Sequence, residues 1–184
     1  AKARALHSKI GYPDVWRDYS SLALADGWFA NHDAAQRFEV ARQLHKVGQP
    51  VDKGEWFMPP SMVNAYYNPL FAEIVFPAGI LQPPFFDAGF PMAMNFGGIG
   101  MVMGHELTHG FDDQGRMFDP KGRMVEWWAP EASARFEERA ACVEQQFNGY
   151  EVAPGLPVNG KLTLGENIAD LGGLKSAYNA FKAW

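Results

Sequence analysis

The chain has 184 residues, of which 47% are hydrophobic and 20% are charged, and its formal net charge is -5. This composition indicates one globular domain and excludes a disordered chain. Its acidic balance, without a basic cluster, argues against nucleic acid as a partner. No apolar run approaches the ~20 residues that a membrane span requires, so we expect no membrane segment in this chain.

The first predicted helix covers residues 33–48. Asp33 is a suitable N-cap, and His45, Lys46 and Gly48 provide the usual signals for a helix end. Its charged faces predict a solvated helix with His32 and His45 at the surface.

Residues 55–87 change in character, because β-branched and aromatic residues dominate and prolines punctuate them. We expect two short strands, near residues 62–67 and 73–76, joined by a turn at Asn68 and Pro69. Prolines border these runs and cannot donate to a β-ladder, so at least one strand should lie at a sheet edge, where a peptide could pair with it.

A helix follows over residues 95–111, although it contains Gly97, Gly98, Gly100 and Gly104, each of which costs about 1 kcal/mol relative to alanine. Close backbone packing would offset that cost. Two further helices are expected over residues 130–150 and 163–184. The last should bury an apolar stripe that consists of Leu171, Leu174, Tyr178 and Phe181.

The stretch HELTH, on the helix predicted over residues 95–111, raises the question of a metal site. His105 and His109 are four residues apart, so their side chains share one helix face, as two ligands of one tetrahedral zinc require. Glu106 lies beside them, where an HExxH site has its general base. An ordinary helix that happens to carry two histidines fits these five residues as well.

A third ligand is harder to assign. The metzincin extension fails, because Asp112 and Gly115 stand where glycine and histidine would be needed. Glu166 is a distant alternative, with Asp170 one turn later on the same helix face. Thr163 and Glu166 also fit a capping box, however, and on these residues alone the cap and the ligand are equally supported.

Longer motifs add a family resemblance. The stretches VNAYY, IVFPAGILQPPFF, GGIGMVMGHELTHGFDDQGRMFDPKGRMVEWW and LTLGENIADLGG occur in this order. Together they resemble the neprilysin family of zinc metallopeptidases, which includes endothelin-converting enzymes and bacterial oligopeptidases. The resemblance runs from KIGYPD to the final helix. The single cysteine and the lack of an Asn-x-Ser/Thr sequon favour a bacterial member.

The resemblance implies an α+β, mainly helical fold: an incomplete thermolysin-like zincin catalytic lobe with a small edge-strand sheet. It implies that His105, His109 and Glu166 bind one zinc ion, which is the arrangement of HExxH plus a distant glutamate. It further implies that Glu106 is the general base and that Asp170 supports a zinc histidine.

The resemblance also implies substrate contacts. Asn64 and Ala65 match the pair that hydrogen-bonds the substrate backbone on the edge strand. Four apolar positions match the family's pocket for the residue after the scissile bond: Ile80, Phe85, Met101 and Val102. These four are equally suited to a hydrophobic core.

The expected function is hydrolysis of oligopeptides by a zinc metalloendopeptidase, before large hydrophobic residues. The alternative is a non-catalytic, zinc-stabilised fragment that binds peptides on its edge strand. Family members carry a catalytic histidine and a substrate-binding arginine beyond the final helix, whereas no histidine follows His109 and no arginine follows Arg139 here. The isolated fragment is therefore expected to be weakly active or inactive.

We accordingly interpret residues 1–184 as a single zinc-bearing part of a peptidase catalytic domain. The family's upstream helical lobe and downstream C-terminal segment are expected as its partners, beside the peptide substrate. The resemblance favours an extracytoplasmic location and leaves a cytoplasmic one open.

Overall fold

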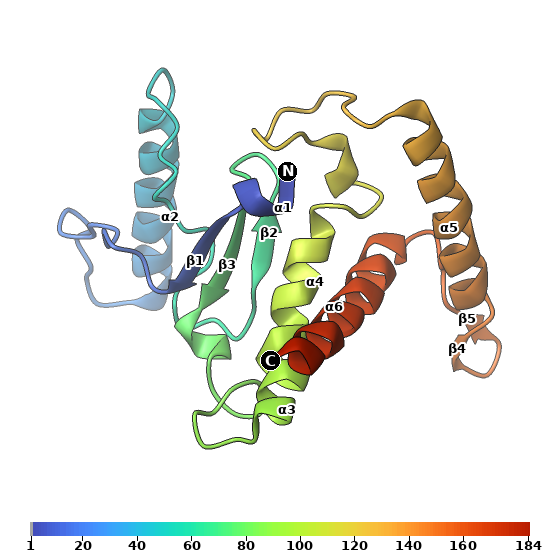
Figure 1. Cartoon of the computed structure of the whole chain (residues 1–184). Helices are drawn as coiled ribbons and strands as arrows, with labels where there is room; N and C mark the ends of the chain where they lie inside the picture. Colours follow the sequence, from blue (N-terminus) through green and yellow to red (C-terminus); the bar gives the residue numbers. More distant parts are fainter. Residues whose placement is uncertain (1) are drawn as a thin grey trace. The chain divides into compact units, whose positions relative to one another are not determined.

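The computed structural model describes residues 2–184, which form two compact units (Figure 1). Residues 13–57 make one unit. The other unit joins the N-terminal stretch up to Tyr12 with residues 58–184 and contains all the candidate site residues. The mainly helical content with small sheets agrees with the predicted fold class.

The unit of residues 13–57 contains helix α2 (Trp28–His45). The predicted start at Asp33 is wrong, because the N-cap is Gly27, whose φ of 111° favours glycine. Asp33 instead accepts a hydrogen bond from Arg37 Nε (2.7 Å) within the helix. His32 and His45 are exposed, as predicted.

A three-stranded sheet in the larger unit has the order β1-β3-β2. Its strands are β1 (His7–Gly11), β2 (Tyr66–Asn68) and β3 (Glu73–Pro77). β3 is the predicted strand at residues 73–76. β2 is much shorter than predicted, but it pairs antiparallel with β3 and lies at a sheet edge. The parallel strand β1 was not predicted, because its partner β3 is distant in the sequence and no turn signal connects the two strands.

The sheet contains a buried ion pair and packs on a hydrophobic cluster. Lys9 Nζ on β1 lies 2.7 Å from Glu73 Oε2 on β3, and the two side chains are 7% and 1% exposed. Phe76 is the most buried member of the cluster, which also includes Ala65, Ile80 and Ile99. Because Phe76 lies on β3, this cluster packs against the sheet.

The predicted helix at residues 95–111 is a continuous helical run in three parts. They are α3 (Met92–Asn95), the π-helical turn η2 (Phe96–Gly100) and α4 (Met101–His109). Gly98 is needed for a close approach, because a Cβ there would overlap the carbonyl oxygen of Phe85, which accepts a hydrogen bond from the Ile99 N–H (2.7 Å). Close backbone packing thus accounts for this glycine, as predicted.

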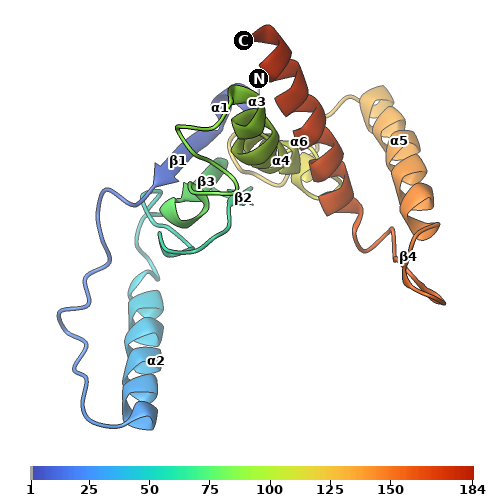
Figure 2. The same ribbon diagram turned by 90° about the horizontal axis from the view of Figure 1, so that it is seen from below.

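Helix α6 (Leu164–Ala183) lies along α4, as both views show (Figures 1 and 2). The two backbones nearly touch at Gly104 and Gly173: a Cβ on Gly173 would come within 2.7 Å of the His105 backbone nitrogen. A Cβ on Gly104 would come within 2.8 Å of the Gly173 carbonyl oxygen. Glycine at both positions therefore permits a backbone approach that a Cβ on either residue would prevent.

The predicted buried stripe on α6 is wrong. Leu171, Leu174 and Tyr178 are 51%, 60% and 60% exposed. The face that packs inward carries small residues instead, namely Ala169, Gly173 and Ala177. Large side chains would hold α6 away from α4, so the small face is the one that fits.

The remaining elements are η1 (Ala78–Ile80), η3 (Gly115–Met117), α1 (Lys2–Ala5), α5 (Pro130–Asn148) and the hairpin of β4 (Glu151–Ala153) and β5 (Leu156–Pro157). α5 matches the helix predicted over residues 130–150. Within residues 2–184, no helix has the length and apolar character needed to cross a membrane.

The contact between α4 and α6 can be tested by adding one methyl group. Gly173→Ala should lower the free energy of unfolding by about 1–3 kcal/mol, because the new Cβ overpacks a backbone contact. The matched control is Gly97→Ala, where nothing lies within 4 Å of the new Cβ; it should be neutral or stabilising by up to about 1 kcal/mol. Chemical denaturation of both variants measures the difference, and equal stabilities would contradict this packing.

Candidate functional site

Two histidines on consecutive turns of α4 face each other. His105 Nε2 and His109 Nε2 are 2.9 Å apart, and the two rings meet edge to face with centroids 4.5 Å apart. Both side chains are mostly buried, at 18% and 17% exposed. The i, i+4 spacing thus places both Nε2 atoms at one point beside the helix.

Glu166, in the first turn of α6, reaches the same point. Its Oε2 lies 3.4 Å from His105 Nε2 and 3.5 Å from His109 Nε2. Ligand atoms of these three residues all lie within 4.8 Å of one another. The contact of α6 with α4 therefore brings a glutamate 57 residues beyond His109 to both histidines.

The capping alternative for Glu166 has no support in the structure. Thr163 is the N-cap of α6 but makes no side-chain capping hydrogen bond within the described part of the chain. Its N–H donates to the Asn159 carbonyl (3.1 Å), and its hydroxyl accepts from Asn167 Nδ2 (2.8 Å). Glu166 is therefore available to the histidines.

A carboxylate oxygen lies within hydrogen-bond distance of Nδ1, the second nitrogen of each imidazole. Asp170 Oδ1 lies 2.8 Å from His105 Nδ1, and Asp112 Oδ2 lies 2.7 Å from His109 Nδ1. An ionised carboxylate can only accept, so both Nδ1 atoms donate and each Nε2 of a neutral ring presents a lone pair. Carboxylates in this position orient metal-binding histidines and fix their tautomer.

Asp112 was not predicted as a site residue; its position served only to exclude the metzincin pattern. Asp112 is 6% exposed. Its Oδ1 also accepts the backbone N–H groups of Gln114 (2.9 Å) and Gly115 (2.6 Å). The carboxylate therefore joins the turn after α4 to the imidazole of His109. The Asp-Asp-Gln-Gly turn signal is the only sequence hint of such a role.

The electrostatics of His109 reflect these neighbours. Burial lowers its pKa, but the hydrogen bond to Asp112 and the charges of Glu166, Asp112 and Glu106 outweigh burial and raise it above the ordinary value. The surroundings of His109 thus favour positive charge on or beside its ring, which a bound cation supplies as well as a proton does.

Glu106 lies on α4 beside the histidines and is 6% exposed. Burial raises the pKa of its carboxyl group, although the nearby His109 and His105 and the backbone N–H of Tyr67 oppose that shift. A carboxylate with a raised pKa is better suited to accept and release a proton near neutral pH.

A cavity of about 530 Å³ opens between the edge strand and α4. The edge-strand side contributes Asn64, Ala65, Tyr66 and Tyr67, and the helices contribute His105, Glu106, His109 and Glu166. The predicted substrate residues Asn64 and Ala65 therefore share one cavity with the candidate metal ligands.

The four predicted pocket residues lie elsewhere. Ile80 is 4% exposed and belongs to the hydrophobic cluster under the sheet, and Phe85 and Val102 pack against that cluster. Met101 is half-buried at the start of α4. None of the four is among the residues that line the 530 Å³ cavity. Three of the four thus belong to the hydrophobic cluster or pack against it, and their role in a substrate pocket stays a prediction.

The role of Asp112 predicts a specific loss of metal affinity. Asp112→Asn should weaken Zn²⁺ binding by about 10–100-fold, because the neutral amide orients His109 less strongly. Asp113→Asn is the matched control, since its Oδ2 contacts Gln114 Nε2 (3.2 Å) rather than a histidine. Competition with a chromophoric chelator measures both affinities, and the assignment fails if the two variants bind zinc equally.

Comparison with known proteins relates this site to other chains. A family model described as Peptidase family M13 matches residues 64–184. An endothelin-converting enzyme homolog of Locusta migratoria is 47% identical over 191 residues, which covers 100% of this chain and 26% of that protein. Neprilysin-3 of Drosophila melanogaster is 46% identical, and the match covers 98% of this chain and 24% of that protein.

Two solved structures are similar to this chain in both fold and sequence. A zinc metalloprotease of Mycobacterium tuberculosis, Zmp1, in complex with an inhibitor superposes with a TM-score of 0.95 at 47% identity, over 100% of this chain and 29% of that one. PepO of Lactobacillus rhamnosis gives a TM-score of 0.88 at 35% identity, over 98% of this chain and 30% of that one. This chain spans about a quarter of the length of the curated relatives that it matches. The family match and the shared fold together show that the chain belongs to peptidase family M13.

Proposed function

We propose that this chain carries the zinc site of a metalloendopeptidase that hydrolyses oligopeptides. The observation that supports it most is the convergence of His105, His109 and Glu166 on one point, with the buried Glu106 beside them. The relatives named as endothelin-converting enzymes and neprilysin make peptides the substrate class to test.

The donor set suits zinc. Two imidazole nitrogens and one carboxylate oxygen are a set that catalytic zinc sites use, with a fourth position left open. A tetrahedron with bonds of about 2.0–2.1 Å has edges of roughly 3.3 Å, close to the 3.4 Å and 3.5 Å that separate Glu166 Oε2 from the two histidines. The 2.9 Å between the two Nε2 atoms is shorter, so binding of a cation would separate them slightly.

The roles of the chain's own residues follow from this geometry. When bound, zinc supplies a Lewis acid that polarises the scissile carbonyl and acidifies a water molecule. The Glu106 carboxylate accepts a proton from the attacking water and releases it to the leaving nitrogen. Its raised pKa favours holding that proton between the two steps.

The edge strand would hold the peptide. Asn64 and Ala65 immediately precede β2. β2 is an edge strand of the sheet, because only β3 pairs with it among the described strands. An extended peptide can add to such an edge through main-chain hydrogen bonds. We assign Asn64, which is exposed, and Ala65 to contacts with the substrate backbone, because both line the cavity beside Glu106.

A preference for large hydrophobic residues after the scissile bond is a finer part of the proposal. It rests on the family resemblance of Ile80, Phe85, Met101 and Val102, and on the hydrophobic cluster that three of them form or border. An extracytoplasmic location likewise stays a prediction from that resemblance. So does the interpretation of residues 1–184 as one zinc-bearing part of a larger catalytic domain.

Two substitutions test the metal and base assignments together. Glu106→Gln should retain about one zinc per chain and lower turnover by roughly 10²–10⁴-fold, because only the proton acceptor is lost. Glu166→Ala should lose zinc, because one of three protein ligands is removed. Metal analysis after washing and reconstitution with zinc, together with peptide cleavage followed by mass spectrometry, measures both in the complete protein.

The outcomes separate the two candidate functions. Normal cleavage by Glu106→Gln would refute its role as general base. Wild-type protein that holds zinc and binds peptides without cleaving them would support the non-catalytic peptide-binding alternative.

Substrate preference can be tested without altering the chain. Two peptides that differ only in the residue after the scissile bond, Phe in one and Asp in the other, should differ in kcat/KM by at least about 10-fold in favour of Phe. Equal kcat/KM values would contradict an apolar pocket at that position.

A further inference from the structure

Lys2 has a buried side chain in the unit that contains the site. It is 2% exposed, and its Nζ donates to three backbone carbonyls: Gly110 (2.6 Å), Gly115 (2.7 Å) and Phe118 (2.7 Å). An ammonium group has three N–H donors, so all of them are used. All three acceptors belong to the turn that follows α4.

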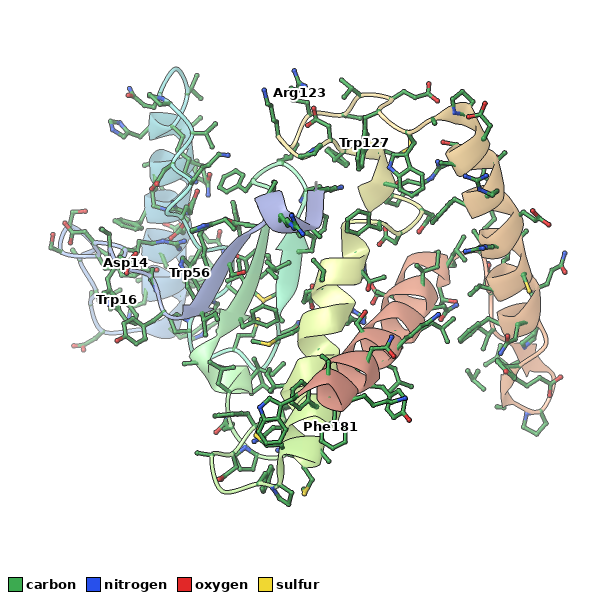
Figure 3. The ribbon with its side chains drawn as sticks, viewed as in Figure 1. Asp14, Trp16, Trp56, Arg123, Trp127 and Phe181 are labelled. Carbon is green, nitrogen blue, oxygen red and sulfur yellow. The ribbon has the colours of Figure 1, made fainter. Side chains whose placement is uncertain are left out.

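Aromatic rings complete the surroundings of this ammonium. Its Nζ lies 5.7 Å, 5.5 Å and 5.6 Å from the ring centroids of Tyr67, Phe111 and Trp127, within the range of cation–π attraction. Trp127 lies on the segment between η3 and α5 (Figure 3). Burial lowers the pKa of Lys2 to about 8, against the opposing charges of Asp112 and Asp119, so the group is mostly charged at neutral pH.

Two of the carbonyls that accept hydrogen bonds from Lys2 belong to residues connected to His109. Gly110 is the next residue after His109, and Gly115 donates its N–H to Asp112 Oδ1 (2.6 Å). Asp112 Oδ2 in turn accepts from His109 Nδ1 (2.7 Å). A Cβ on Gly115 would overlap the His109 carbonyl oxygen, so the turn folds back onto the residue that it supports.

Asp112 and Lys2 form hydrogen bonds with complementary backbone groups of this turn. Asp112 accepts two of its backbone N–H groups, at Gln114 and Gly115, whereas Lys2 donates to three of its carbonyls. Gly110 and Gly115 are buried, so without Lys2 their carbonyls would lose this donor away from solvent. An unsatisfied buried acceptor is costly, so the turn would open or shift.

We propose that Lys2 is a positioning residue for the metal site: it holds the turn of residues 110–118 closed around Asp112, which keeps His109 Nε2 directed at His105 and Glu166. The inference rests on the proposed zinc site. Nothing in this role requires Lys2 to touch the substrate or the metal.

The first test compares two buried lysines in the same unit. Lys2→Met removes the three donors and should weaken Zn²⁺ affinity by about 10-fold or more, the loss typical of a broken outer contact to a metal ligand. Lys9→Met is the matched control, because Lys9 is also buried but pairs with Glu73 in the sheet. It should lower the melting temperature while zinc affinity stays within about 2-fold, since its ion-pair partner Glu73 lies on β3 and not in the turn.

The route through Asp112 gives a second readout. If Lys2 acts through that carboxylate, the double variant Lys2→Met with Asp112→Asn should bind zinc about as weakly as Asp112→Asn alone, because contacts in one network are not additive. Fully additive losses would overturn the inference, and so would equal losses of zinc affinity in Lys2→Met and Lys9→Met.

A third measurement uses the wild-type chain and does not depend on the folding of any variant. Coupling between two sites is reciprocal, so bound zinc should protect Lys2 from an amine-reactive reagent. Peptide mapping should show that zinc slows modification of Lys2 by about 10-fold relative to Lys9. Equal effects on both lysines would overturn the inference while the zinc site stands, whereas a wild-type chain that binds no zinc would overturn the proposed function as well.

Discussion

The near contact of two helix backbones determines the geometry of this site. α4 carries both histidines and α6 carries Glu166, and the helices approach at Gly104 and Gly173 without side chains between them. A larger residue at either position would overlap the backbone of the other helix and so push α6, with Glu166, away from the histidines. The arrangement of the candidate ligands thus depends on two glycines, which have no side-chain chemistry of their own.

Polar contacts then determine how the imidazoles are oriented. Asp170 comes from the same helix as Glu166, so one packing contact places both a candidate ligand and a carboxylate that contacts His105. His109 depends instead on the turn that follows its own helix, through Asp112. The two rings are therefore held from different directions, and the buried turn beside His109 needs donors and acceptors for its own backbone groups. Lys2 provides three of those donors.

Sequence patterns predicted best those features that depend on local periodicity. The i, i+4 spacing of His105 and His109 fixes their relative direction on any helix, and two glycines of that helical run, Gly98 and Gly104, correctly indicated close backbone packing. The apolar stripe with Leu171 and Leu174 was misread, because periodicity shows that a face is apolar but does not show that anything covers it. β1 was missed because parallel pairing with β3 leaves no turn signal in the sequence.

The sequence by itself determined the family and the candidate ligands, since long motifs in a fixed order are specific and the spacing within HELTH is local. It left Glu166 balanced between helix cap and ligand, and it assigned no role to Asp112 or Lys2. Only the tertiary structure placed these side chains, because Glu166 and Lys2 meet segments far apart in the chain, and the contact of Asp112 with His109 depends on how the turn after α4 folds. Lys2 meets carbonyls more than a hundred residues away, and Glu166 reaches the histidines only because two glycines let the helices touch.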